Sequence, residues 1–244
     1  MTTVIGIKCT DGIIIASDSQ ATSPSMKNME ESKIFKISDS ICIGASGDIR
    51  HIKILVEKLK KDIGELVYNN ESQIRDCIYE SLLSLHKFYN VDRSFRLGYK
   101  ETKLFFQPSA LLAVKIPDMT FCLYYIGSDL WLDVIDNYQT IGSGSILANL
   151  VLTQQSRIPK LNNEKFSDRM VEQNIWTSII TINEVKAIEP KTGGDTKIIT
   201  ITKEGLTEIS NEHQSEIYKN TVHNTAKILG QRLFGNDQYI NEFK

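Results

Sequence analysis

The start of the chain holds the feature that most restricts the fold, which is two pairs of short apolar runs. The first pair lies within residues 3–17 and turns at Thr10-Asp11-Gly12, and the second, 34–37 and 41–45, is joined by Ser38-Asp39-Ser40. Asp-Gly and Ser/Asp connections between apolar runs are typical of β-hairpins. The second pair is apolar at nearly every position, which indicates a sheet covered on both faces. We therefore expect helices above and below the strands.

Helical periodicity supplies these covering layers. Between residues 49 and 66, apolar side chains recur at helical spacing, and Asp48 is placed to cap the first turn. A second pattern of the same kind covers about 72–89. Further along, the sequence predicts strands over 110–116, 120–126 and 130–135, helices over 146–155 and about 167–187, strands over 197–202 and 206–209, and a final helix over 211–234.

The order of these elements indicates the fold class. Runs of strands alternate with pairs of helices, and the chain contains no internal repeat, which predicts an α+β protein with two sheets sandwiched between helical layers. Residues 90–108 have mixed charge and no clean period. We expect a loop or rim insertion over 91–108, within a single domain that spans residues 1–244.

Composition excludes several classes of function. The 244 residues are 41% hydrophobic and 24% charged, as in an ordinary globular protein with a sizeable core. The net charge is -2 and the Lys and Arg residues are scattered, so the footprint of a nucleic-acid-binding protein is absent. No window approaches the roughly 18 apolar residues that span a bilayer, and no targeting segment is recognisable. We expect a cytoplasmic protein that binds neither nucleic acid nor membranes.

The cysteines carry no sign of metal or redox chemistry. They are widely spaced in apolar runs, without a CxxC pair and with few histidines nearby, which favours small buried side chains in a reducing compartment. We expect no metal and no cofactor. The four positions are Cys9, Cys42, Cys77 and Cys122.

Thr2 is the first residue that suggests chemistry. Methionine aminopeptidases remove Met1 when the second side chain is small, which would leave a threonine whose own α-amine is a base. Such an amine has a pKa of about 7.7–8.0 and can take the hydroxyl proton without a histidine. Alone, a Met-Thr-Thr start is weak evidence, because many processed proteins begin with a small residue.

The chain as a whole resembles the catalytic β subunits of the proteasome and the related HslV-type peptidases, which are N-terminal-nucleophile hydrolases. Each motif is common by itself, and their joint order and spacing make the match specific. The resemblance implies a four-layer α-β-β-α sandwich of two mainly antiparallel sheets between helical layers. The motifs are Thr2-Thr3-Val4-Ile5-Gly6-Ile7, Ala16-Ser17-Asp18-Ser19-Gln20-Ala21-Thr22, Lys33-Ile34-Phe35-Lys36-Ile37, Ala45-Ser46-Gly47-Asp48 and Ile141-Gly142-Ser143-Gly144-Ser145.

The resemblance assigns roles to residues around Thr2. Asp18 and Lys33 are implied to form an ion pair beside the nucleophile, where the ammonium would favour deprotonation of the hydroxyl and the amine. Lys36 is the rival, but three positions along a strand place it on the opposite face from Lys33. Gly47, between a strand and a helix, is implied to offer its N–H as an oxyanion hole.

Three further positions are implied to orient the terminal amine. Ser143 matches the serine that hydrogen-bonds this amine in the family, although Gly-Ser-Gly is also a common turn. The family pattern of an aspartate, two residues, a serine and two glycines is altered here, because Glu189 and Thr192 occupy the acidic and hydroxyl places. Glutamate is longer by one methylene, so we expect a shifted network. The segment from Asp18 to Lys33 is also one residue shorter than usual.

Four residues are candidates for binding the substrate. Ala45 lies two positions before Gly47, so both face one side of the strand and Ala45 is expected to floor the pocket beside the scissile bond. Ala21, Thr22 and Ile49 are its neighbouring candidates, Ile49 being the weaker because it can turn into the core. An apolar pocket of this kind favours large hydrophobic side chains.

The function implied is that of a threonine endopeptidase subunit. The family assembles into rings that enclose the active sites, so unfolded polypeptides are the expected substrate, copies of the chain the expected ring partners, and an ATP-dependent unfoldase ring a further partner by analogy. Two alternatives stay open, a catalytically silent ring subunit and an N-terminal-nucleophile amidohydrolase acting on a small amide. The silent subunit is disfavoured because it would not need to retain Thr2, Asp18, Lys33, Gly47 and Ser143 together. A monomer or dimer in gel filtration would favour the amidohydrolase.

Overall fold

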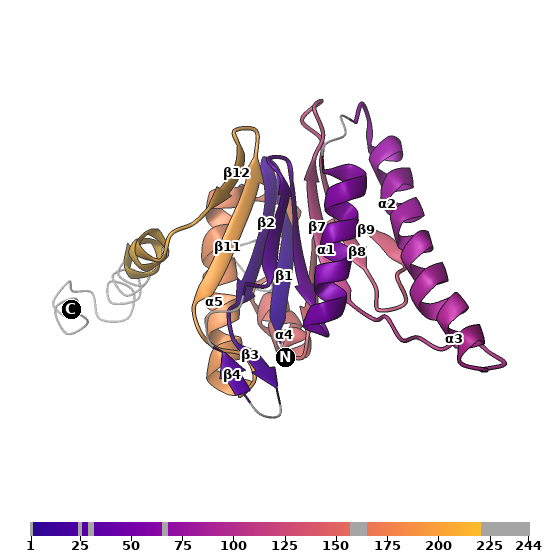
Figure 1. Ribbon diagram of the computed structural model, residues 1–244. Helices are drawn as coiled ribbons and strands as arrows, with labels where there is room; N and C mark the ends of the chain where they lie inside the picture. The colour runs from indigo at the N-terminus through magenta and orange to yellow at the C-terminus, as the bar shows by residue number, and fades with distance from the viewer. Residues whose placement is uncertain (1, 24–25, 29–31, 65–67, 157–164, 221–244) are drawn as a thin grey trace, which may run out of the picture. The chain divides into compact units, whose positions relative to one another are not determined.

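The computed structural model describes residues 2–23, 26–28, 32–64, 68–156 and 165–220, and the side chains of 32–64, 68–156, 165–220 and 2–20. Its contacts divide the chain into two compact units, Met1–Glu208 and Ile209–Lys244. The first unit holds both sheets (Figure 1). In the second, residues 211–220 are helical, and the remainder of the helix predicted over 211–234 lies outside the described residues.

The N-terminal strands build the first of two large sheets. Its order is β10-β1-β2-β11-β12, and its pairs are all antiparallel. The predicted hairpin at the start of the chain and the predicted pair near residue 200 are both present. The strands are β1 (Thr3–Lys8), β2 (Gly12–Asp18), β10 (Tyr138–Gly142), β11 (Thr196–Thr202) and β12 (Gly205–Glu208).

The second large sheet follows the chain order β5-β6-β7-β8-β9 and is also antiparallel throughout. The four predicted segments from 34–37 to 120–126 each form a strand, and 130–135 forms a shorter one. A separate two-stranded ribbon pairs β3 (Ala21–Ser23) with β4 (Met26–Asn28). The sheet consists of β5 (Ile34–Ser38), β6 (Ile41–Ser46), β7 (Ser109–Lys115), β8 (Phe121–Ile126) and β9 (Leu132–Ile135).

Helices cover the outer face of each sheet, as Figure 1 shows. The helices α1 (Ile49–Ile63) and α2 (Glu71–His86) pack on the second sheet, and α4 (Ser145–Ser156) and α5 (Val171–Ile188) pack on the first. The four-layer α-β-β-α sandwich is therefore confirmed. None of the helices in the described ranges is long and apolar enough to cross a membrane.

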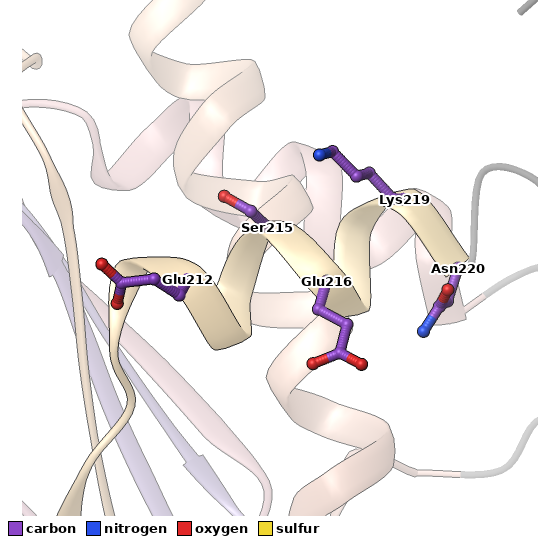
Figure 2. Close-up of a pocket in the computed structure, with 5 residues that line it drawn as sticks. All are labelled: Glu212, Ser215, Glu216, Lys219 and Asn220. Atoms are coloured by element: carbon purple, nitrogen blue, oxygen red, sulfur yellow. The ribbon is translucent and has the colours of Figure 1, made fainter. Parts of the chain in front are cut away.

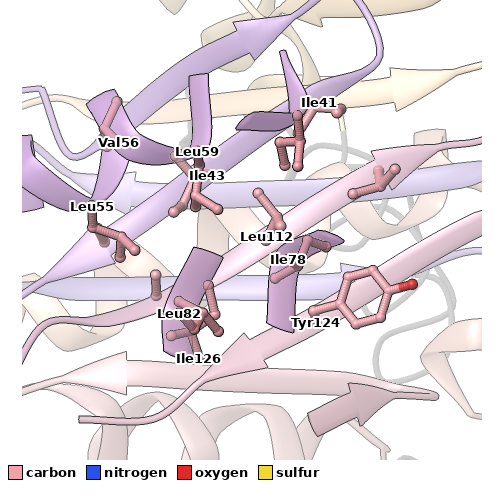
Figure 3. Close-up of a cluster of buried hydrophobic side chains, with 14 of the residues drawn as sticks. Ile41, Ile43, Leu55, Val56, Leu59, Ile78, Leu82, Leu112, Tyr124 and Ile126 are labelled. Carbon is pink, nitrogen blue, oxygen red and sulfur yellow. The ribbon is translucent and has the colours of Figure 1, made fainter. Parts of the chain in front are cut away.

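Apolar side chains fill both the helix layer and the space between the sheets. Figure 3 shows the first cluster, in which Leu55 and Leu59 of α1 and Ile78 of α2 lie over strand residues such as Ile43 and Tyr124. At about 25 cal/mol per Å² of apolar area, such burial is the main stabilising term. A second cluster joins the sheets and contains Val4, Ile13, Ile15, Ile34, Cys42, Leu111, Ala113, Leu123, Ile141, Ile199 and Ile201.

Gly44 explains how closely the two sheets approach. A Cβ at this position would lie 2.6 Å from Val4 Cγ1 and 2.7 Å from Ile15 Cγ2. Only a residue without a side chain lets β6 sit against the first hairpin there. The close contact holds the start of β1 next to the strand that leads to Gly47.

Part of the segment 91–108, which we expected to be a loop or rim insertion, is helical. The helix α2 continues through a π-helical segment, η1 (Lys87–Asp92), into the short α3 (Arg93–Arg96), so residues 91–96 are helical and only the rest of 91–108 is irregular before β7. Asn90 explains the arrangement, because its buried amide accepts from Phe106 N at 2.8 Å and donates to Phe106 O at 3.4 Å. The returning segment is thereby fixed to the helix.

Candidate active site

Asp18 is the centre of a buried polar cluster at the end of β2. Its side chain is 0% exposed and accepts four hydrogen bonds. Oδ1 accepts from Thr3 N at 2.8 Å and Lys33 Nζ at 2.7 Å, and Oδ2 accepts from Gln20 N at 3.3 Å and Gly193 N at 3.1 Å. The carboxylate therefore joins the start of β1, the residue before β5 and the loop before β11.

Lys33 reaches Asp18 from the second sheet. Its side chain is 5% exposed, and its carbonyl accepts from Ala45 N at 2.9 Å, which extends the ladder between β5 and β6 by one residue. Lys36 instead pairs with Asp39 at the surface, with both side chains more than half exposed. The strand alternation that separated the two lysines thus matches the structure, and the buried pair is Lys33 with Asp18.

Two backbone hydrogen bonds hold the segment that contains Thr2. The amide of Thr3 is fixed by Asp18, and Gly144 N donates to Thr2 O at 3.5 Å. Thr2 is 8% exposed. By strand alternation it shares a face with Val4, which lies in the cluster between the sheets. The Thr2 side chain is therefore directed to the same side of β1 as the opposite sheet, the sheet that supplies Lys33.

The turn Gly142-Ser143-Gly144 encloses the backbone of Thr2 and Thr3. Gly142 has φ +94°, a region that other residues rarely adopt, and a Cβ there would overlap the Thr2 carbonyl oxygen. A Cβ at Gly144 would overlap Thr3 Oγ1. Ser143 is exposed between these two glycines. The turn places Ser143 next to the N-terminal segment, and its hydrogen bond to the terminal amine stays a prediction.

The Glu189–Thr192 segment contacts the start of β1 through Thr192. Thr192 is buried, and its Oγ1 lies 2.9 Å from Thr3 Oγ1. Glu189 follows the last turn of α5, and its Oε1 accepts from Lys191 N at 3.2 Å. The Thr192 hydroxyl thus contacts the N-terminal strand, whereas the Glu189 carboxylate accepts a hydrogen bond within its own turn.

Gly47 lies between β6 and α1 with φ +126°. A Cβ there would be 3.3 Å from Gln107 O, so both the backbone conformation and the space favour glycine. Asp48 caps the helix by accepting from Arg50 N at 2.9 Å. Gly47 therefore sits exposed at the N-terminal end of α1, where partial positive charge favours an anion.

The four candidates for substrate binding differ in burial and in location. Ala45 is 0% exposed and belongs to the apolar cluster under α1 and α2. Ile49, the first residue of α1, is 39% exposed. Ala21 and Thr22 lie in β3, and their side chains are outside the described part. The pocket role of all four residues stays a prediction.

Histidine, cysteine and acidic side chains are the other candidates for a base, a nucleophile or a metal ligand. Among the described histidines, His51 packs on Phe106 and His86 lies 3.3 Å from the Asn90 amide, and in the second unit His213 lies 3.8 Å from Glu216. Burial raises the pKa of the Cys9 and Cys42 thiols to about 12, which leaves them protonated near neutral pH. Within the described ranges, no group of three or more His, Cys, Asp and Glu side chains could hold a metal.

Lys186 is a residue near the cluster that the sequence motifs do not reveal. It projects from α5, and its Nζ donates to Thr196 Oγ1 at 2.6 Å. Burial lowers the pKa of this lysine to about 8, against the opposing effects of Asp18 and Asp195. The sequence could have indicated Lys186 only through the register of α5, because that register turns this position toward β11. Helical periodicity alone does not single out one lysine.

Figure 2 shows a pocket in the C-terminal unit, formed by one helix. Its lining side chains are polar, and they include two carboxylates and one ammonium. The residues are Glu212, Ser215, Glu216, Lys219 and Asn220.

Comparisons with known proteins agree with the fold. The profile of the family described as Proteasome subunit matches residues 1–98. A proteasome subunit beta from Nanoarchaeum equitans is 30% identical over 88% of this chain and 100% of its own length. One from Methanosphaera stadtmanae is 27% identical over 89% of this chain and 95% of its own. A proteasome subunit alpha from Methanocaldococcus jannaschii is 36% identical, but over only 30% of this chain.

The two-sheet sandwich between helical layers, together with the similarity to proteasome β subunits, places the chain in the class of N-terminal-nucleophile hydrolases. The similarity to β subunits extends over nearly the full chain, and the α subunit matches a short part. The chain belongs to the proteasome β-subunit family.

Proposed function

We propose that this chain is a threonine-type endopeptidase subunit whose nucleophile is Thr2 after removal of Met1. The observation that carries the proposal is the buried ion pair of Asp18 and Lys33, which shares an oxygen with the Thr3 amide. A buried pair of charges is costly to desolvate and is weak evidence for stability alone. Its position at the start of β1 is the place where an N-terminal nucleophile needs a cation.

The proposed reaction uses the terminal amine as base. The neutral amine of Thr2 takes the proton from the Thr2 hydroxyl, and Oγ attacks the carbonyl carbon of the peptide bond. The carbonyl oxygen becomes an oxyanion that accepts from Gly47 N–H. The amine then gives its proton to the departing amino group, which leaves an acyl ester on Thr2. Water hydrolyses this ester by the same proton transfers.

Lys33 and Asp18 act on the first step in this proposal. The Lys33 ammonium stabilises negative charge on the threonine oxygen and lowers the pKa of the amine. Asp18 holds that ammonium at 2.7 Å and positions the Thr3 amide. A buried lysine without this carboxylate would favour its neutral form.

Ser143, Glu189 and Thr192 complete the proposed orientation of the amine. Ser143 borders Thr2 in the turn, and Thr192 fixes the Thr3 side chain. Because Glu189 accepts from Lys191 N, we propose that Thr192 and Ser143 contribute more to the orientation than Glu189 does.

The biological setting is proposed from the family. We infer that copies of the chain assemble into a ring enclosing the active sites, that unfolded polypeptides are the substrate and that an ATP-dependent unfoldase delivers them in the cytoplasm. Gel filtration with light scattering tests the ring.

The nucleophile is tested with Thr2→Ala and Thr2→Ser assayed on fluorogenic peptides. Thr2→Ala should abolish hydrolysis and leave the assembly unchanged, because it removes one hydroxyl. Thr2→Ser keeps the hydroxyl and should retain measurable activity. Activity of Thr2→Ala near that of the wild type would overturn the proposal.

A further inference from the structure

A second lysine approaches the Asp18–Lys33 pair from a different layer of the fold. Lys186 projects from α5 on the outer face of the first sheet, whereas Lys33 comes from the second sheet. Its Nζ donates to Thr196 Oγ1 at 2.6 Å, and that hydroxyl lies 3.4 Å from Asn183 Oδ1, to which it donates. Since a hydroxyl has one proton, this pattern fixes its direction and leaves a lone pair for Lys186.

The strand register brings this lysine to the active-site cluster. Thr196 is the residue directly opposite Asp18 in the ladder between β2 and β11. A side chain anchored on Thr196 is therefore carried next to the strand end that bears the carboxylate. The charges that act on Lys186 are those of Asp18, Asp195 and Lys33.

We propose that Lys186 is a positioning residue of the site, a second cation that acts on the Thr2 amine through the Asp18–Lys33 pair. This inference rests on the proposed function, because it assigns an effect on the Thr2 base. With the carboxylates of Asp18 and Asp195 and the ammoniums of Lys33 and Lys186, the charges of the cluster balance, so removing the Lys186 ammonium leaves a net negative charge. A net negative charge raises the pKa of a neighbouring amine and leaves less of it in its basic form at neutral pH.

The pKa of Lys186 lies near the pH at which the proposed reaction takes place. Burial, the largest effect, lowers its pKa to about 8, and Asp18 and Asp195 oppose that shift. The side chain is therefore mostly charged at pH 7, and the cluster loses this cation as the pH rises through 8. A lysine that only tied α5 to β11 would not transmit its charge to the reaction.

The pH dependence of kcat/KM on a fluorogenic peptide tests this role. Lys186→Met removes the charge and should move the acid limb of the profile to higher pH by roughly one unit, because the Thr2 amine loses a neighbouring cation. Lys186→Arg keeps a permanent charge and should restore the wild-type acid limb. The control is Lys197→Met, because Lys197 adjoins Thr196 and lies near Glu208 on the surface, with 41% exposure. An unshifted acid limb in Lys186→Met would overturn the inference.

A second measurement does not depend on activity. Competitive acetylation of the purified protein over a range of pH, followed by peptide mass spectrometry, gives the pKa of each lysine. Lys186 should titrate below the ordinary lysine pKa of about 10.4, and in Asp18→Asn its pKa should fall further because the carboxylate that favours its charge is gone. The same Lys186 pKa in both proteins would overturn the inference alone. Absence of Thr2-dependent hydrolysis in the wild type would instead overturn the proposed function and the catalytic effect with it.

Discussion

Asp18 Oδ1 accepts from Lys33 Nζ at 2.7 Å, and both side chains are almost completely buried. The same oxygen accepts from the amide of Thr3. One carboxylate thus connects an ion pair between two sheets to the residue that follows the candidate nucleophile. The geometry allows the electrostatic and the positional roles of this pair to be separated by substitution.

Asp18→Asn should abolish most of the peptidase activity and destabilise the fold. The amide oxygen can still accept from Thr3 N, but Lys33 loses its counter-charge, and removing one partner of a buried pair costs about 3–5 kcal/mol. Chemical denaturation and kcat measure the two effects. Asp39→Asn is the control, because it breaks the exposed pair with Lys36 and should change neither quantity. Wild-type activity in Asp18→Asn would contradict the assigned role.

Gly142→Ala should lower activity by roughly 100-fold, because the new Cβ overlaps the Thr2 carbonyl oxygen and displaces the proposed nucleophile. Gly98→Ala is a matched control, since Gly98 also has positive φ, at +79°, but a Cβ there meets nothing within 4 Å. It should cost about 1–2 kcal/mol of stability through backbone strain and leave kcat unchanged. Equal kcat values for the two variants would show that the contact with Thr2 is unimportant.

Asp48 should make the stability of α1 depend on acid. The Arg50 side chain and backbone N–H hold the pKa of the Asp48 carboxyl well below its usual range. A lowered folded pKa means that the stabilisation is present above the ordinary pKa of about 3.9 and is lost as the pH falls. The effect is small, because the Asp48 side chain is 37% exposed and its partner Arg50 is 81% exposed, so solvent screens the pair. Tm measured from pH 7 to 3 should show a difference between wild type and Asp48→Asn that shrinks below pH 4. A constant difference would contradict this.

Local sequence patterns predicted much of the fold for identifiable reasons. The hairpin at Asp11-Gly12 and the Asp48 cap depend on neighbouring residues, and both are present. The strand β10 was missed because Tyr138–Gly142 mixes polar and apolar residues, and its partner β1 is distant in sequence. The helical extension beyond His86 was missed because it depends on the tertiary contact of Asn90 with Phe106.

The candidate site was predicted less completely than the fold. The pairing of Asp18 with Lys33 was implied by the family resemblance, whereas Lys186 reaches the cluster through the register of α5 on β11. Glu189 matches a family position by spacing, yet its carboxylate accepts from Lys191 N. Spacing defines where a residue lies along the chain, and the direction of its side chain depends on the surrounding packing.

The most direct test of the central claim is covalent labelling of the nucleophile. Purified, active protein is treated with an irreversible electrophilic peptide until hydrolysis stops, and the modified residue is located by peptide mass spectrometry. We predict one adduct per inactivated chain, on Thr2 of a chain that lacks Met1. An adduct on any other residue that accounts for the lost activity, or full activity in a sample that retains Met1, would contradict the account.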